Sequence, residues 1–315
     1  MIKKFLKYLM HEPLRIIDAC VARMNAFLPD RVYLSLRYRC QVGSWIDWKK
    51  PRTFSEKIQW LKVYGFKPEY SKYIDKFAVK EIIANKIGRE YIIPTIGVWT
   101  NVDDIAWLDL PNKYVLKITD EGGSNGVYIC SNSNNFKRDE VVKKIAQIMN
   151  KKKRGKDIHR EHPYEYIPRK IIAEKYIECN SMNQENELCD LTDYKFYCFN
   201  GKPRYCQIIR NRRTKETIDF YDMEWNHMPF VGLNPAAKNG LNPVEKPKNL
   251  NVMIDLCEKL SKEFYFVRVD MYNVDGTVYF GELTFYPASG FGVFEPDEWN
   301  YKLGDLLKLP LEALK

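Results

Sequence analysis

One stretch of the chain carries more information about the fold than any other: Phe264-Tyr-Phe-Val-Arg-Val-Asp-Met-Tyr-Asn-Val-Asp-Gly-Thr-Val-Tyr-Phe-Gly-Glu-Leu-Thr-Phe-Tyr-Pro287. It holds two runs rich in β-branched and aromatic residues, at 265–272 and 277–285. Between them lies Asn-Val-Asp-Gly, a sequence typical of turns. The stretch therefore predicts a β-hairpin.

Four polar side chains alternate with apolar ones along this hairpin: Arg268, Asp270, Glu282 and Thr284. Strand alternation turns them away from the apolar neighbours, and pairing across the hairpin would bring the two carboxylates close together. Two adjacent carboxylates repel unless a cation lies between them, and oxygen ligands suit Mg²⁺ held jointly with substrate phosphates. Considered alone, the segment also allows a surface hairpin with charged outer positions.

Length and composition narrow the class of protein. A chain of 315 residues, 45% hydrophobic, predicts a globular protein of two or three subdomains. No apolar run approaches the ~20 residues that span a bilayer. The net charge of +9 suits anionic small-molecule or glycan substrates. We interpret the basic run at 151–156 as a solvated loop, because no nucleic-acid-binding module is recognisable.

The first thirteen residues are basic and partly apolar, and they predict an amphipathic helix rather than a signal peptide. We expect this helix to dock on its own domain, with binding to an anionic membrane surface as the alternative. The eight cysteines contain no Cys-x-x-Cys pair and predict reduced thiols, as in the cytoplasm. The expected location is therefore the cytoplasm, with the inner face of the membrane as the alternative. His159 and His162 lack the partners of a zinc site.

The chain up to about residue 70 looks helical, with a capping box at Thr53-Phe-Ser-Glu56. Helices and strands then alternate, which predicts an α+β arrangement. The expected helices cover 75–88, 102–107, 139–150 and 249–263, and the expected strands cover 91–99, 114–118, 127–130 and 171–177. Strands dominate after residue 194.

A glycine-rich loop joins two of these strands: Lys117-Ile-Thr-Asp-Glu-Gly-Gly-Ser-Asn-Gly-Val127. Glycines allow successive backbone N–H groups to converge on phosphate oxygens, although a glycine-rich hairpin turn is equally compatible with the loop alone. Lys117 is more specific, because a lysine inside an apolar strand requires an anionic partner.

Together these pieces resemble the ATP-grasp superfamily, and within it the TupA-like family of bacterial surface-polysaccharide loci. The resemblance covers roughly residues 72–310. The superfamily features occur in order as Asp75-Lys76, Lys117 with its glycine loop, Glu174-Lys-Tyr-Ile177, Arg268-x-Asp270 and Glu282-x-Thr-x-x-Pro287. The narrower family is suggested by Asp193-Tyr-Lys-Phe-Tyr-Cys-Phe-Asn-Gly-Lys-Pro203, Phe220-Tyr-Asp-Met-Glu-Trp-Asn226 and Gly281-Glu-Leu-Thr-Phe-Tyr-Pro287.

The resemblance implies an ATP site with a role for each position. Lys76 and Lys117 would hold ATP phosphates or the adenine edge, and Asp193 would bind the ribose. The loop closing over the β- and γ-phosphates would comprise Glu121, Gly122, Gly123, Ser124, Asn125 and Gly126. The adenine hinge would comprise Glu174, Lys175, Tyr176 and Ile177.

The resemblance also implies the catalytic groups. Asp270 and Glu282 would ligate Mg²⁺, with Thr284 where related ligases often carry asparagine. Arg268 would stabilise the charged intermediate. Asn226 stands where related ligases can carry a phosphate-binding lysine, and its replacement would be Lys195, Arg210 or Arg212.

The expected fold is therefore an ATP-grasp fold, with two α+β subdomains gripping ATP after a mostly helical N-terminal region. The expected boundaries are 1–71, 72–177 and 178–315. The expected function is an ATP- and Mg²⁺-dependent ligase that joins a carboxylate to an amine through an acyl phosphate. Its substrates would be a carboxylated sugar or glycan precursor and an amino acid, in capsule or cell-surface polysaccharide biosynthesis. The alternatives are a glycosyltransferase of a polysaccharide locus and an ATP-grasp kinase acting on a sugar.

Overall fold

The computed structural model describes residues 13–122, 126–151, 157–178, 191–210, 216–234 and 236–314. Several sequence predictions fall outside these residues. They are the N-terminal amphipathic helix, the loop positions Gly123, Ser124 and Asn125, most of the basic run, Cys179, Cys189 and Arg212.

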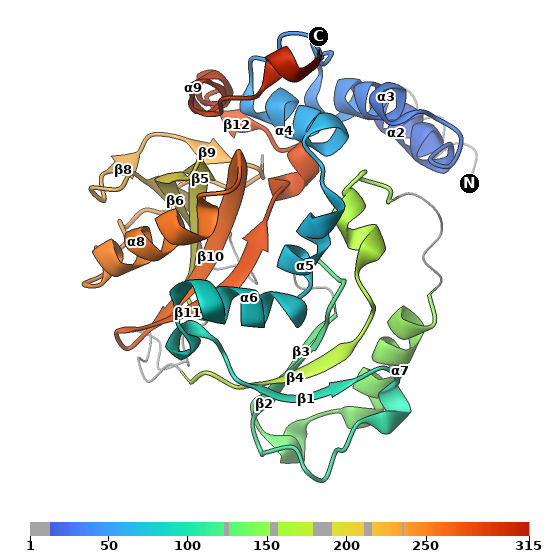
Figure 1. The fold of residues 1–315 in the computed structure, drawn as a ribbon, viewed down its shortest axis with the longest axis vertical. Coiled ribbons are helices and arrows are strands. Elements are labelled where there is room, and N and C mark those ends of the chain that lie inside the picture. Colours follow the sequence, from blue (N-terminus) through green and yellow to red (C-terminus); the bar gives the residue numbers. More distant parts are fainter. Residues whose placement is uncertain are drawn as a thin grey trace.

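Two antiparallel sheets dominate the architecture (Figure 1). The larger has the strand order β11-β10-β5-β6-β7-β8, and the smaller has the order β1-β4-β2-β3. The larger comprises β5 (Asp193–Phe199), β6 (Lys202–Arg210), β7 (Thr217–Tyr221), β8 (His227–Met228), β10 (Phe266–Val274) and β11 (Thr277–Thr284). The smaller comprises β1 (Thr95–Trp99), β2 (Tyr114–Ile118), β3 (Val127–Cys130) and β4 (Ile171–Lys175). Strands β9 (Val231–Gly232) and β12 (Phe294–Glu295) form a separate pair.

The helices frame these sheets (Figure 1). The α-helices are α2 (Pro13–Arg23), α3 (Asp30–Val42), α4 (Phe54–Tyr64), α5 (Ser71–Ile74), α6 (Ala78–Ile87), α7 (Arg138–Met149), α8 (Leu250–Ser261) and α9 (Glu298–Leu306). Short 3₁₀ turns are η1 (Pro68–Tyr70), η2 (Arg89–Tyr91), η3 (Val102–Asp104), η4 (Ser133–Asn135), η5 (His162–Tyr166), η6 (Pro287–Gly290) and η7 (Leu311–Leu314). None of the described helices is long and apolar enough to cross a membrane.

The predicted capping box is present and fixes the start of α4. The Glu56 backbone N–H donates to the Thr53 hydroxyl at 3.2 Å, and the Thr53 N–H donates to the Glu56 carboxylate at 2.9 Å. Both bonds satisfy N–H groups that a helix end would otherwise leave unpaired. The next residue, Phe54, then packs its ring against Phe266 of β10, with 5.0 Å between ring centroids.

The predicted hairpin is also present, but its turn is shorter than predicted. Strand β10 continues to Val274, which pairs with Thr277, so only Asp275 and Gly276 connect the strands. Both have positive φ, 50° and 84°. A two-residue turn with left-handed backbone matches the twist of the paired strands, and Asp-Gly is a preferred sequence for it.

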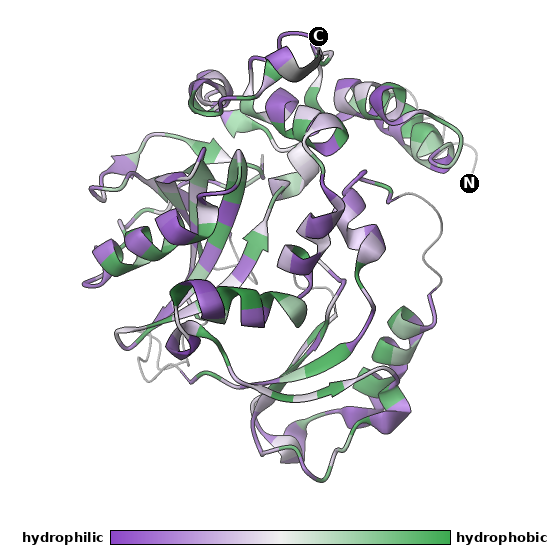
Figure 2. Ribbon diagram, in the orientation of Figure 1, coloured by the Kyte–Doolittle hydropathy of each residue, from purple (hydrophilic) through white to green (hydrophobic). Residues whose placement is uncertain are grey.

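Two hydrophobic cores lie on either side of a polar region. The larger packs α4, α8 and α9 on the six-stranded sheet, and the smaller lies between the four-stranded sheet and α7. Helix α8 covers the face of β10 that carries Val267, Val269 and Met271, all of which are fully buried. Apolar residues recur along the strands of both sheets (Figure 2). The opposite face of β10 therefore carries its polar residues.

Two other sequence predictions differ from the structure in this part of the chain. The strand predicted at 91–99 begins at Thr95, because the preceding residues form η2 and an irregular link. The helix predicted at 102–107 is only the turn η3. Among the described cysteines, Cys130, Cys198, Cys206 and Cys257 are buried thiols, whereas Cys20 is exposed. The subdomain boundaries stay a prediction.

Candidate functional site

Strand register assembles a polar cluster on the six-stranded sheet. Asp270 of β10 lies directly opposite Glu282 of β11 on one side and Lys195 of β5 on the other. The adjacent pair on β10 and β5 is Tyr272 with Asp193. Because side chains of directly opposed residues share a face, all of these groups point to the side away from α8.

Asp270 is the centre of this cluster. Arg268 donates to its two carboxylate oxygens at 2.6 and 2.7 Å, and Lys195 also contacts Oδ2. Lys195 binds Asp193 at 2.6 Å as well. Burial would raise the pKa of Asp270, but attraction to Arg268 and Lys195 outweighs it and lowers that pKa. Asp270 is therefore an ionised carboxylate enclosed by cations.

Glu282 and Thr284 form the accessible side of the same cluster. The side chain of Glu282 is 38% exposed, against 2% for Asp270. One Glu282 oxygen accepts from Arg268 at 3.2 Å and from the Thr284 hydroxyl at 3.1 Å. The side chains of Asp270, Glu282 and Thr284 offer only oxygen atoms as metal ligands, and Mg²⁺ prefers oxygen ligands. Two carboxylates suffice where substrate phosphates complete the coordination shell. The described residues contain no group of three or more metal-type side chains, so the fit is to a metal shared with phosphates.

A second charged cluster lies on the four-stranded sheet. Glu174 of β4 binds Lys117 of β2 and Lys80 of α6, each at 2.5 Å. Burial would raise the pKa of Glu174, but the two lysines outweigh it and lower that pKa. Sequence reasoning missed Lys80. The available signal was its position one helical turn after Lys76.

Lys76 connects the two clusters. Its ammonium group donates to the backbone carbonyl of Glu121, at the start of the glycine loop. Burial lowers the pKa of Lys76, while the Glu282 carboxylate favours its charged form and the Lys117 charge disfavours it. Gly126 closes the loop with a φ of +69°, and a Cβ there would lie 3.1 Å from the Glu121 side chain. Only glycine fits this position without strain.

Tyr272 is a second site residue that sequence reasoning missed. Burial raises the pKa of its hydroxyl, and the carboxylates of Asp193, Glu282, Asp270 and Glu174 raise it further. Its side chain therefore lies among acidic groups from both sheets. The available signal was its position two residues after Asp270, on the same strand face.

Some predicted positions are not brought together. Arg210 lies three residues from Gln207, the register partner of Lys195, so alternation puts Arg210 on the other face of the sheet. There it binds Asp219 at 2.8 Å. Asn226 bonds to Asp222 at 2.8 Å. Of the hinge positions, Lys175 is exposed, whereas Tyr176 and Ile177 are half-buried directly after β4.

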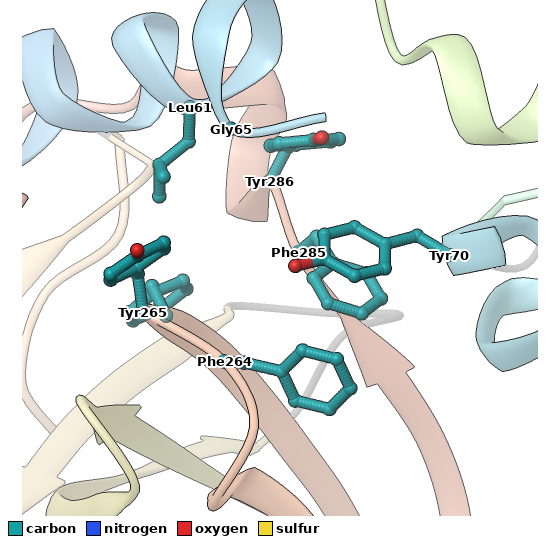
Figure 3. A pocket seen from close by; sticks show the side chains of 8 residues that line it. Leu61, Gly65, Tyr70, Phe264, Tyr265, Phe285 and Tyr286 are labelled. Atoms are coloured by element: carbon teal, nitrogen blue, oxygen red, sulfur yellow. The ribbon is translucent and has the colours of Figure 1, made fainter. Parts of the chain in front are cut away.

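Two cavities are lined by residues outside these clusters. The first has a volume of only about 10 Å³ and lies where α4 meets the start of β10, among aromatic side chains such as Tyr70 and Phe285 (Figure 3). Such a space holds about one water molecule and is too small for a substrate. The second, of about 280 Å³, lies between helices α2 and α3 and the segment with Phe291 and Val293.

The chain is similar to several solved structures, each at low sequence identity. No curated protein matches the chain. A solved D-alanine–D-alanine ligase from Bacillus anthracis is similar at 18% identity and a TM-score of 0.46, over 81% of this chain and 74% of that one. A D-alanine–D-alanine ligase from Helicobacter pylori shares 14% identity at a TM-score of 0.40, over 81% and 69% of the two chains. An ATP-grasp RimK domain protein from Sphaerobacter thermophilus shares 11% at 0.39, over 75% and 68%.

These structural similarities are too distant to show a family by themselves, and the family-model match shows it. The model of the family described as TupA-like ATPgrasp matches residues 56–308, which include every described residue of both charged clusters. The predicted ATP-grasp fold is thereby confirmed. The chain belongs to the TupA-like ATPgrasp family.

Proposed function

We propose that this protein is an ATP-dependent ligase that joins an amino acid or a similar amine to a carboxylated sugar, in the biosynthesis of a capsule or another cell-surface polysaccharide. The observation that supports it is the juxtaposition of two charged clusters, with Lys76 between the glycine loop and Glu282. Phosphate transfer to a carboxylate brings two anions together, and such an arrangement can neutralise both.

Each cluster has its own part in the proposed site. Lys76, Lys80 and Lys117 would hold the ATP phosphates, with Glu174 keeping the last two in place. The loop at 121–126 would close over the phosphates, and the segment at 174–177 would contact the adenine through its backbone. Asp193 would bind the ribose, and Tyr272 would pack beside the nucleotide.

The hairpin would supply the groups around the reacting carboxylate. Asp270, Glu282 and Thr284 would hold Mg²⁺ together with the phosphates, and the metal would neutralise charge on the transferred group. Arg268 and Lys195 would stabilise the negative charge of the acyl phosphate and of the tetrahedral species. Lys195 is a better candidate than Arg210 for the missing phosphate-binding lysine, because it touches Asp270 and Arg210 lies on the other face.

The test is turnover of Mg-ATP with a panel of uronic acids and nucleotide-linked uronates, each combined with a set of amino acids. We expect phosphate release that needs both substrates, and a product whose mass is that of an amide. A phosphoester product would instead identify a sugar kinase. Thermal stabilisation by a nucleotide sugar, but not by Mg-ATP, would favour a glycosyltransferase.

A further inference from the structure

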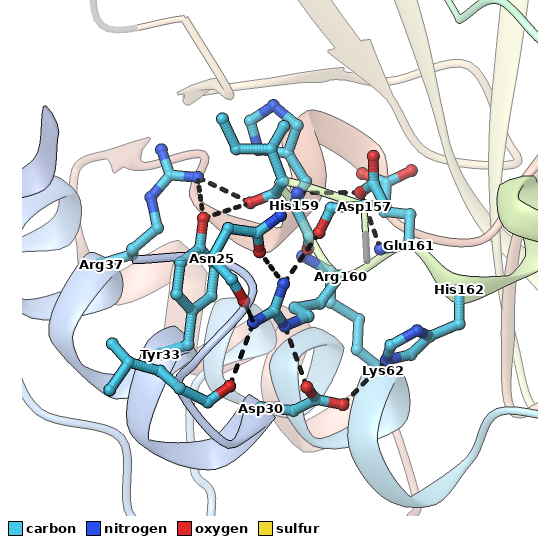
Figure 4. A network of polar contacts seen from close by, with 12 residues as sticks. Asn25, Asp30, Tyr33, Arg37, Lys62, Asp157, His159, Arg160, Glu161 and His162 are labelled. Carbon is cyan, nitrogen blue, oxygen red and sulfur yellow. Dashed lines mark hydrogen bonds and ion pairs between the residues drawn. The ribbon is translucent and has the colours of Figure 1, made fainter. Parts of the chain in front are cut away.

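The helical hairpin formed by α2 and α3 lies at one edge of the molecule (Figure 1). Its inner side is fixed to the segment at 157–166 by charged side chains (Figure 4). Arg160 of that segment is fully buried and binds Asp30 at 2.9 Å. Arg37, which binds Asp18 at 2.8 Å, donates to a backbone carbonyl of the same segment at 2.8 Å. Both acidic residues of the hairpin are therefore neutralised from within the protein.

The exposed side of α2 carries a row of apolar side chains, which we call the apolar stripe. Leu14, Ile17, Cys20 and Met24 follow one another at intervals of three or four residues, and all four are exposed. That spacing puts them on one side of the helix. Phe27, in the turn after α2, continues the stripe and is 83% exposed. Single exposed apolar residues are common, but a contiguous row of them indicates an interaction surface.

The same end of the chain carries most of the net positive charge. Residues 1–52 contain eleven lysines and arginines and four acidic residues, which gives a net charge of +7 against +9 for the whole chain. Four arginines of the hairpin are exposed: Arg15, Arg23, Arg31 and Arg39. Because the two aspartates of the hairpin are paired internally, its outer surface is cationic. It is therefore complementary to an anionic partner.

The chemistry of the hairpin favours a lipid surface as that partner. An apolar row flanked by basic residues is the pattern of helices that lie in a membrane interface. Trp45 follows α3, is 59% exposed and precedes the exposed Lys49 and Lys50. Tryptophan is enriched at the interface between bilayer and water, where its ring lies among the headgroups. Gln41 bonds to Asp18 at 3.1 Å, so the two helices run antiparallel and Trp45 lies at the end where α2 begins.

A second copy of this chain fits the stripe less well. It would bring its own exposed arginines against those of the first hairpin, and repulsion between like charges disfavours such an interface. An anionic bilayer offers phosphate groups to the arginines and acyl chains to the apolar residues at the same time.

We propose that the α2–α3 hairpin is a docking surface for an anionic lipid bilayer. The apolar stripe enters the boundary between headgroups and acyl chains, and the exposed arginines bind lipid phosphates. This surface shares no residue with the two charged clusters on the sheets. The proposal is therefore independent of the proposed function.

Vesicle flotation with the full chain tests this proposal. The vesicles contain phosphatidylcholine alone, or phosphatidylcholine and phosphatidylglycerol in equal parts, and each type is used at low and at high salt. A double variant, Met24→Asp with Phe27→Asp, puts two carboxylates in the stripe. Its matched control is Leu108→Asp with Leu241→Asp, the same change at two fully exposed leucines outside the hairpin. Arg23→Gln removes one exposed charge.

Cys20 provides a second measurement, because it is an exposed thiol within the stripe. Its alkylation rate is followed by mass spectrometry of the tryptic peptide at 16–23, with and without each type of vesicle. We expect the anionic vesicles to slow this reaction and the phosphatidylcholine vesicles to leave it unchanged.

We expect the wild type to bind the anionic vesicles at low salt and to be released at high salt, which screens the arginines. The Met24→Asp and Phe27→Asp double variant should bind about tenfold more weakly or less, and its control should bind as the wild type does. Arg23→Gln should lower binding about fivefold, the contribution of one basic residue near an anionic surface.

Three results would overturn the proposal. The first is a wild type that does not bind anionic vesicles at low salt, or a stripe variant that binds as well as its control. The second is a Cys20 thiol that resists alkylation without vesicles, because another part of the protein then covers the stripe. The third is a dimer that the stripe variant dissociates, which would assign the stripe to a second copy of the chain.

Discussion

Glu174→Gln tests whether the buried Glu174 carboxylate, rather than the apolar core alone, holds α6 to the four-stranded sheet. The Glu174 side chain is 5% exposed, and each oxygen faces one lysine at 2.5 Å. The variant leaves Lys80 and Lys117, which are 13% and 18% exposed, without their counter-charge. Removing one partner of a buried ion pair costs about 3–5 kcal/mol. Because the amide can still accept one hydrogen bond and the lysines reach some solvent, we expect about 3 kcal/mol.

Thermal and urea unfolding measure this loss, and hydrogen exchange of the β2 and β4 amides locates it. A loss of about 3 kcal/mol corresponds to a fall in Tm of roughly 4–5 °C, because the unfolding entropy is about 2.1 cal/mol/K for each of the 315 residues. The matched control is Glu178→Gln, whose carboxylate binds Lys113 at 2.9 Å with side chains 55% and 42% exposed. A surface pair of this kind is worth at most about 1 kcal/mol.

The pH dependence of the Glu174→Gln effect has a definite sign. The folded-state pKa of Glu174 lies below its ordinary value of 4.5. Its contribution is therefore fully present above that value and is lost as the pH falls through the lowered folded-state pKa. The difference between wild type and variant should shrink only in acid. A Glu174→Gln protein whose stability stays within 1 kcal/mol of Glu178→Gln at pH 7 would refute the role of the buried pair.

The remaining predictions concern the proposed site and the fold. Lys195→Met should lower kcat about 10²–10³-fold, since it removes a preorganised cation beside Asp270; steady-state phosphate release measures this, and near-normal turnover would contradict it. Glu282→Gln should raise the Mg²⁺ concentration for half-maximal turnover roughly tenfold or more, and an unchanged titration would remove Glu282 from the metal site. Thr53→Ala should cost about 1 kcal/mol in urea unfolding through loss of the α4 cap. Gly276→Ala, at a φ of +84°, should cost a similar amount, and no loss would mean that the turn adapts.

Local sequence patterns decided much of the fold. The alternation along 264–287 predicted the hairpin and the shared face of Arg268 and Asp270, because strand geometry is a property of consecutive residues. The capping box at Thr53 likewise depends only on neighbours three positions apart. The predicted turn was two residues too long, since its length depends on pairing between the strands rather than on turn composition alone.

Long-range contacts decided the parts that the sequence left open. Nothing near Lys195 in the sequence distinguishes it from Arg210 as a phosphate-binding candidate. Strand register places the first against Asp270 and the second on the other face of the sheet. Lys80 and Tyr272 were missed for the same reason, because Glu174, which binds Lys80, and Asp193, which pairs with Tyr272, are distant from them in the chain.

By itself, then, the sequence determined the family, the hairpin and the types of charged group that the reaction needs. The hairpin follows from the two-residue periodicity of its strands, and the family follows from the resemblance of its ordered motifs to known ATP-grasp proteins. Only the tertiary structure decided which cations meet which carboxylates. It also brought Glu161 within hydrogen-bond distance of Ser289, a residue about 130 positions away in the chain. Coulomb energy and the loss of hydration depend on distance in space and on burial, and neither can be read from positions along a chain.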